Sequence, residues 1–231
     1  MSHTVHPYSH RLGIIRDWKS RWFGVKGKYR QFLKGDTIIR MYLEKRLRGN
    51  YVSTIEMERS EKALKVIVET SRPGMIIGRQ GEGATKLRND ILKELSRHGI
   101  TTKEELKLDI KEVRSPESNA MIVGQMVAEG LEKRMPFRRV MKQALDKIMA
   151  NRDVKGAKIV MSGILGGSTM ARVETLKKGR IPLQTLRADI DYALFEARLA
   201  LGKVGIKVWI YKGDIFEKDL NKTQNQSQNQ S

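Results

Sequence analysis

The sequence predicts an α+β fold in two domains, and three observations lead to this prediction. The chain has 231 residues, enough for one large or two ordinary domains, and its hydrophobic fraction of 39% suffices for real cores. Residues 36–114 show the order helix, strand, strand, short helix, helix, strand. Residues 115–213 show two helices followed by four strands, which predicts helices packed on one face of a sheet.

The first domain is predicted to begin with a helix. Asp36 and Thr37 are plausible N-caps, and Gly49 with Asn50 would end the helix after about residue 47. The other elements follow from the period of the apolar residues: strands at 51–58, 64–68 and 106–111, a short helix at 73–77 and an amphipathic helix from 82 to about 98.

Ser115–Pro116 marks the boundary to the second domain, because a Ser-Pro pair favours a turn. The elements expected beyond it are helices at about 117–133 and 136–150, then strands at about 157–163, 170–176, 185–193 and 204–211. The segment 214–231, which finishes QNQSQNQS, is polar and of low complexity. It cannot bury enough apolar surface to order itself, so we predict a disordered C-terminal tail.

Residues 1–35 are basic and aromatic and show no lasting helical or strand period. We therefore predict an irregular N-terminal arm, which could pack on a domain or lay its aromatic rings on RNA bases. The residues expected to contact RNA from this arm are Arg11, Arg16, Lys19, Arg21 and Trp22.

The charge of the chain limits its function. Lys and Arg number 45 against 26 Asp and Glu, a formal net charge of +19, so the protein needs a polyanionic partner or carries a heavy self-repulsion. The absence of cysteine excludes disulfides, a thiol nucleophile and Cys-ligated metal sites. No apolar run reaches the ~18 residues of a membrane span, and the start resembles no signal peptide. We expect a cytoplasmic nucleic-acid-binding protein; a peripheral membrane protein is the weaker alternative, because the basic residues are spread along the chain.

The sharpest local motif is the G-x-x-G turn Gly78-Arg79-Gln80-Gly81 between the short helix and the amphipathic helix. Its glycines lack a Cβ, so a sugar–phosphate backbone can approach closely. The start of the following helix favours phosphate, and Arg79 adds a positive charge. A bare G-x-x-G is mostly just a tight turn, but in this order of elements it predicts a nucleic-acid clamp.

The segment 36–113 resembles a KH domain of type II, in which the G-x-x-G loop grips single-stranded nucleic acid. Other stretches resemble the family of the third protein of the bacterial-type small ribosomal subunit, and the likeness covers roughly residues 3–213. The matching stretches are VHP at 5–7, RLGI at 11–14, MSG at 161–163, AR at 171–172, GRIPL at 179–183, TLRADIDY at 185–192 and GIKVWI at 205–210.

This resemblance implies a structural protein of the small-subunit head. Such a protein binds small-subunit rRNA, lines the channel through which mRNA enters, and has the small-subunit proteins ten, fourteen, two, four and five as neighbours. It also implies an mRNA-unwinding role for Arg138, Arg139 and Lys142. The helical spacing agrees, because all three lie away from the apolar stripe of their helix and can hold phosphates of an incoming strand.

Two other classes of function remain as alternatives: a free-standing KH regulator of mRNA, and an enzyme acting on nucleic acid such as a nuclease or lyase. The enzyme hypothesis needs a carboxylate cluster or an activated lysine, and the sequence offers neither. His3, His6 and His10 lie near no carboxylate, and Asp189 with Asp191 is better explained by ion pairing with Arg187 on one strand face. We therefore expect no catalysis, no metal, no cofactor and no small-molecule substrate.

Overall fold

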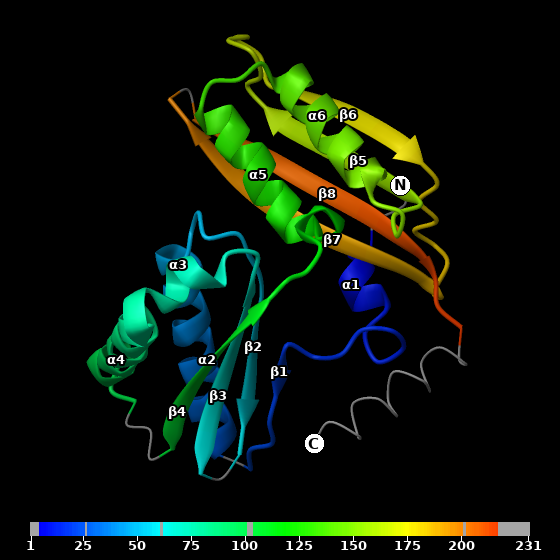
Figure 1. The fold of residues 1–231 in the computed structure, drawn as a ribbon. Helices are drawn as coiled ribbons and strands as arrows, with labels where there is room; N and C mark the ends of the chain where they lie inside the picture. Colours follow the sequence, from blue (N-terminus) through cyan, green and yellow to red (C-terminus); the bar gives the residue numbers. More distant parts are fainter. Residues whose placement is uncertain (1–4, 26, 61, 101–103, 201, 217–231) are drawn as a thin grey trace. The chain divides into compact units, whose positions relative to one another are not determined.

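The computed structural model describes residues 5–25, 27–60, 62–100, 104–200 and 202–216 (Figure 1). The chain forms two compact units, one of residues 18–115 and one that joins residues 1–17 to residues 116–231. The predicted arm over 1–35 is thus divided between the two units. Of the predicted tail, all but residues 214–216 lies outside the described residues, as does His3.

The unit of residues 18–115 is a four-stranded sheet in the order β1-β2-β3-β4. Strands β2 and β3 are antiparallel, and β3 and β4 are parallel. Helices α2 and α4 each bury an apolar stripe against the sheet, and the short helix α3 adds the single buried side chain of Ile76. The elements are β1 (Ser20–Arg21), α2 (Gly27–Arg46), β2 (Val52–Arg59), β3 (Ala63–Thr70), α3 (Pro73–Ile77), the 3₁₀ turn Arg79–Gly81, α4 (Glu82–Arg97) and β4 (Glu105–Glu112).

Helix α2 begins nine residues before the predicted N-cap, so the assignment of Asp36 and Thr37 as caps is wrong. Asp36 lies inside the helix and is buried. Its carboxylate accepts hydrogen bonds from Trp22 Nε1 at 2.6 Å and from Arg59 Nη2 at 3.1 Å. The residue type that suits a helix start is used here for a buried ion pair, which a one-dimensional pattern does not reveal.

The second unit is a fully antiparallel sheet in the order β6-β5-β8-β7, with α5 and α6 on one face. Its elements are α1 (Pro7–His10), the 3₁₀ turn Pro116–Ser118, α5 (Ala120–Glu132), α6 (Phe137–Ala150), β5 (Gly156–Gly163), β6 (Arg172–Gly179), β7 (Ala188–Leu199) and β8 (Gly202–Asp214). The two predicted helices and four predicted strands are all present, so the expected α+β class is confirmed.

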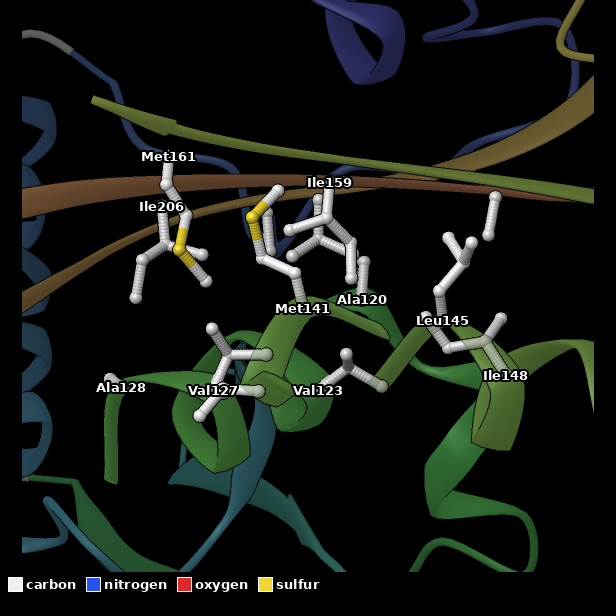
Figure 2. Packing of buried hydrophobic residues seen from close by; sticks show 14 of the residues in the cluster. Ala120, Val123, Val127, Ala128, Met141, Leu145, Ile148, Ile159, Met161 and Ile206 are labelled. Carbon is white, nitrogen blue, oxygen red and sulfur yellow. The ribbon is translucent and has the colours of Figure 1, made fainter. Parts of the chain in front are cut away.

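The core of this unit lies between the two helices and the sheet. Figure 2 shows side chains of both helices, among them Val127 of α5 and Met141 and Leu145 of α6, on the side where Ile159 and Ile206 of the sheet lie. All five side chains are buried. The amphipathic stripe of α6 therefore packs inward, and this fixes the opposite side of α6 as an exposed face.

The prediction that Arg187 forms ion pairs with Asp189 and Asp191 is wrong. Arg187 pairs with Asp214 at 3.3 Å, whereas Asp189 pairs with Arg16 at 2.5 Å. Asp191 accepts a hydrogen bond from the backbone N–H of Ala120 at 2.8 Å. A register shift between residues 189 and 190 places the two carboxylates on different partners, one toward the N-terminal segment and one at the start of α5.

Candidate nucleic-acid interface

The G-x-x-G turn stands exposed between α3 and α4. Its residues take unusual backbone conformations, with φ of 72° at Gly78, 53° at Gln80 and 83° at Gly81. A Cβ at Gly81 would meet no atom within 4 Å. The backbone at Gly81 is therefore open to a close approach, as the clamp hypothesis requires, while Arg79 and Gln80 are exposed beside it.

A further glycine, Gly83, fixes the angle at which the turn is presented. A Cβ at Gly83 would come within 2.5 Å of the Ile76 carbonyl oxygen and 2.8 Å of the Ile77 carbonyl oxygen. Only glycine allows the first turn of α4 to pack this tightly against the end of α3. This role was not predicted from the sequence, although the position of Gly83 two residues after the motif was a visible signal.

The electrostatics at the turn favour an anion. Helix α4 is 16 residues long and begins directly after the turn, so the positive end of its dipole points there. Arg79 and, one turn into α4, Lys86 add positive charge, while Glu82 in the first turn opposes it. The exposed Met75 and Ile77 of α3 provide apolar surface next to the turn.

Helix α6 carries the second candidate surface. Arg138, Arg139 and Lys142 are all exposed, and in the described part of the chain none of them pairs with a carboxylate. The Arg138 guanidinium lies 5.6 Å from the centre of the Phe137 ring, and the guanidinium of Arg172 on β6 lies 5.2 Å from it. Phe137 thus holds two arginines at the start of α6. Arg172 was not predicted from the sequence, because the pairing of β6 with α6 through this ring has no local signal.

The arm residues behave differently from the prediction. Arg11 is fully buried, so its assignment as an RNA contact is wrong. Its guanidinium donates to four backbone carbonyls, of Pro7, Leu183, Thr185 and Ala188, at 2.6–3.0 Å. Burial lowers the pKa of the Arg11 guanidinium, while the nearby Asp189 raises it. Arg11 is a structural cation that ties the N-terminal segment to β7 and the loop before it.

Other predicted arm contacts are bonded within the chain. Arg16 pairs with Asp189, and Trp22 donates to Asp36. Arg21 bonds Glu58 and Glu56 at 2.6 and 2.7 Å, and the hydrogen bond from Arg21 to Glu58 raises the pKa of the guanidinium. Lys19 is exposed, and its carbonyl accepts from the N–H of Met57.

The most exposed aromatic side chains of this region are Trp18 and Phe23, at 61% and 85% exposure; Tyr29 follows at 52%. The composition of the segment gave no means of telling these rings from the half-buried Trp22. They offer flat apolar faces to a partner, which the ring of Trp22 does not, because Tyr29 and Phe32 pack against it at 5.2 and 5.6 Å.

Of the histidines considered from the sequence, His6 has a structural use. His6 caps α1 by accepting from the N–H of Tyr8, and its ring meets the Tyr192 ring edge-on at 4.6 Å. Across the described ranges, no group of three or more His, Asp or Glu side chains is placed to hold a metal ion. In the same part of the chain, no helix has the length and apolar character that a membrane crossing needs.

Comparisons with known proteins agree with this geometry. The family description "Ribosomal protein S3, C-terminal domain" matches residues 127–210, and "KH domain" matches residues 38–118. A protein of Caldicellulosiruptor saccharolyticus called "Small ribosomal subunit protein uS3" is 46% identical over 94% of both chains. Proteins of the same description from Pseudomonas aeruginosa and Clostridium novyi are 42% and 40% identical, over 94% and 99% of this chain and 91% and 100% of their own.

The chain belongs to the uS3 family. It is therefore a structural, non-enzymatic constituent of the small ribosomal subunit, and the resemblance noted from the motifs is confirmed. The G-x-x-G turn belongs to the KH match and the basic face of α6 to the match with the uS3 C-terminal domain. Membership of this RNA-binding family accounts for the class of partner that the net charge requires.

Proposed function

We propose that this uS3 protein binds small-subunit rRNA in the head of the subunit and lines the channel through which mRNA enters. In this proposal Arg138, Arg139 and Lys142 hold the phosphates of the incoming strand. They disfavour the mRNA duplex because a single strand fits the helix face better, and no nucleotide hydrolysis is involved. Proteins ten, fourteen and two would adjoin it in the head, and proteins four and five at the channel.

One observation supports the role of α6 above the others. Three cations lie on one exposed helix face, opposite a buried apolar stripe, and none is neutralised by a carboxylate in the described part of the chain. A solvated face of a stable monomer gains little from three unpaired like charges this close together, since they repel one another. A phosphate backbone would remove this repulsion, and its charge density suits a row of Arg and Lys.

The test replaces Arg138, Arg139 and Lys142 together by alanine and measures translation through an mRNA hairpin and through an unstructured leader. We expect elongation through the hairpin to slow several-fold and elongation through the unstructured leader to change little. The matched control replaces Lys147, Arg152 and Arg198, which are exposed in the same unit, and so removes the same charge elsewhere. Equal slowing on both mRNAs, or equal effects of the two triple variants, would contradict the unwinding role.

A further inference from the structure

In the part of the chain that the structure describes, the face of the second sheet that points away from α5 and α6 is covered at one end only. There His6 of the N-terminal segment meets Tyr192, and Ile181 and Leu183 pack with the buried Trp209. The rest of this face carries exposed or half-buried side chains of all four strands. The two candidate surfaces described above do not include this face, because α6 lies on the opposite face of the sheet and the G-x-x-G turn belongs to the other unit.

The strand register places the side chains of this face in rows across the sheet. Lys177 of β6 is directly opposite Lys158 of β5, and Lys158 is directly opposite Trp209 of β8. In the next row Val160 of β5 is opposite Lys207 of β8. Three lysines from three strands thus gather around one point, although they are up to 49 residues apart in the sequence.

This arrangement is electrostatically unfavourable for the isolated protein. Like charges directly opposite one another on neighbouring strands destabilise a sheet. Within the described residues no carboxylate forms an ion pair with Lys158, Lys177 or Lys207, and Glu196 on the same face is paired with Lys203 at 2.8 Å. The Lys158 ammonium lies 5.1 Å from the Trp209 ring centre, a contact that orients it but leaves its charge in place.

The shape of the face favours a nucleic-acid backbone over unstacked bases. Trp209 is only 6% exposed and offers no free ring for a base to stack on. Next to the row of Lys207, Ser162 of β5 is opposite Gly205 of β8, and a Cβ at Gly205 would lie 3.0 Å from Ser162 Oγ. The same row ends in the exposed Val173 of β6 and the exposed Glu196 of β7. The low centre of this row, beside Lys207 and with Glu196 already paired with Lys203, leaves room for a phosphodiester chain.

We propose that this face, defined by Lys158, Lys177 and Lys207, is an additional RNA-binding surface that holds the phosphate backbone of folded RNA without reading its sequence. The inference rests on the proposed rRNA-binding function and adds a surface to it on the side of the sheet opposite α6. An RNA backbone neutralises the three unpaired charges, whereas a protein partner would have to supply matching carboxylates.

The first experiment compares the wild-type chain with the variant Lys158→Gln/Lys177→Gln/Lys207→Gln in binding to a small-subunit rRNA transcript at several salt concentrations. Each phosphate contact adds about 0.9 to the slope of log affinity against log salt, by the value for duplex DNA, so we expect the slope to fall by about 2 to 3. A control variant, Lys45→Gln/Lys133→Gln/Lys147→Gln, removes the same charge from exposed sites outside the face. Since the face lysines repel one another, the first variant should unfold at the same or a higher temperature than the wild type.

Three outcomes would overturn the inference. An equal slope change in both variants would mean that only net charge matters. A loss of folding in the face variant would mean that the lysines are structural. The third outcome comes from lysine acylation, which mass spectrometry measures at each lysine of the protein bound to the rRNA transcript and of the protein in assembled subunits. If the three lysines are protected from acylation only in assembled subunits, the face binds a protein neighbour. If the wild type itself fails to bind the transcript, it is the proposed rRNA binding that fails.

Discussion

At the scale of single residues, the glycines around the G-x-x-G turn have different tasks. Gly81 combines a positive φ of 83° with open space where a Cβ would stand, so its backbone is available to a ligand. Gly83 is closed in by the carbonyl oxygens of Ile76 and Ile77, so it serves the packing of α3 on α4. Substitutions at the two positions therefore affect different properties.

The substitution Gly81→Asp tests the clamp. Asp tolerates a positive φ better than most residues, so the fold should persist, but its carboxylate adds a like charge where the phosphate would lie. We expect the affinity for single-stranded RNA to fall about tenfold, equal to about 1.4 kcal/mol, in an equilibrium binding titration. Gly13→Asp is the matched control, because Gly13 also has a positive φ of 77° and a Cβ there would meet no atom within 4 Å. Similar losses in both variants would contradict the clamp.

Arg11→Lys tests whether Arg11 is structural. Lysine keeps the charge but cannot reach four carbonyls in the fork geometry of a guanidinium. Buried carbonyls would lose their donors, and we expect the free energy of unfolding to fall by about 3 kcal/mol in a denaturant titration. RNA affinity at low temperature should stay at the wild-type value. An unchanged free energy of unfolding together with weaker RNA binding would show that Arg11 is an RNA contact after all. The control is Arg152→Lys, because Arg152 is exposed.

At the scale of elements, the parts with a clear period could be predicted from the sequence. Helix α3 starts at Pro73 and ends at Ile77 as expected, and β8 covers the alternating segment that was the clearest strand. The start of α2 could not be predicted, because residues 27–35 are mostly exposed and show no apolar stripe. Tertiary contacts hold this part of α2 in place, because Asp36 accepts hydrogen bonds from Trp22 and Arg59, which lie outside α2.

Asp36→Ala tests how α2 is fastened. The substitution leaves Trp22 Nε1 without its acceptor and removes one of the two carboxylates around the buried Arg59, whose other partner is Glu104 at 3.0 Å. We expect a loss of about 3 kcal/mol in the free energy of unfolding of this unit, because one side of a buried ion pair is removed. Asp36→Asn keeps an acceptor for the indole and should lose less. Equal losses, or none, would contradict the account of α2.

The candidate interface likewise has parts that could be predicted from the sequence and parts that could not. The G-x-x-G turn and the basic face of α6 are local in sequence, so their positions relative to turns and helix faces follow from spacing alone. Arg172 and the lysine face of the second sheet depend on strand pairing over long separations, which spacing does not fix. The prediction that Arg11 of the arm contacts RNA was wrong for a related reason, because basic composition does not distinguish the buried Arg11 from an exposed arginine.

At the scale of the whole molecule, the net charge of +19 is distributed over distinct surfaces. Not every basic side chain adds to this excess at the surface: Arg11 is buried, and the charges of Arg16, Arg21 and Arg59 are balanced by carboxylates. Exposed cations that form no ion pair among the described residues lie, among other places, at the G-x-x-G turn, on α6 and on the open face of the second sheet. A chain charged in this way repels itself, and assembly with RNA in the small subunit removes that repulsion.

The most direct test of the central claim uses the absence of cysteine from the sequence. Lys142→Cys, labelled with a thiol-reactive photo-crosslinker and assembled into small subunits, should cross-link to mRNA downstream of the decoded codon. Arg152→Cys, exposed beyond the C-terminal end of α6, should cross-link to mRNA far less. Cross-linking of mRNA at position 142 but not at 152 is the predicted result. No mRNA cross-link from position 142 in assembled subunits would contradict the placement of α6 at the channel.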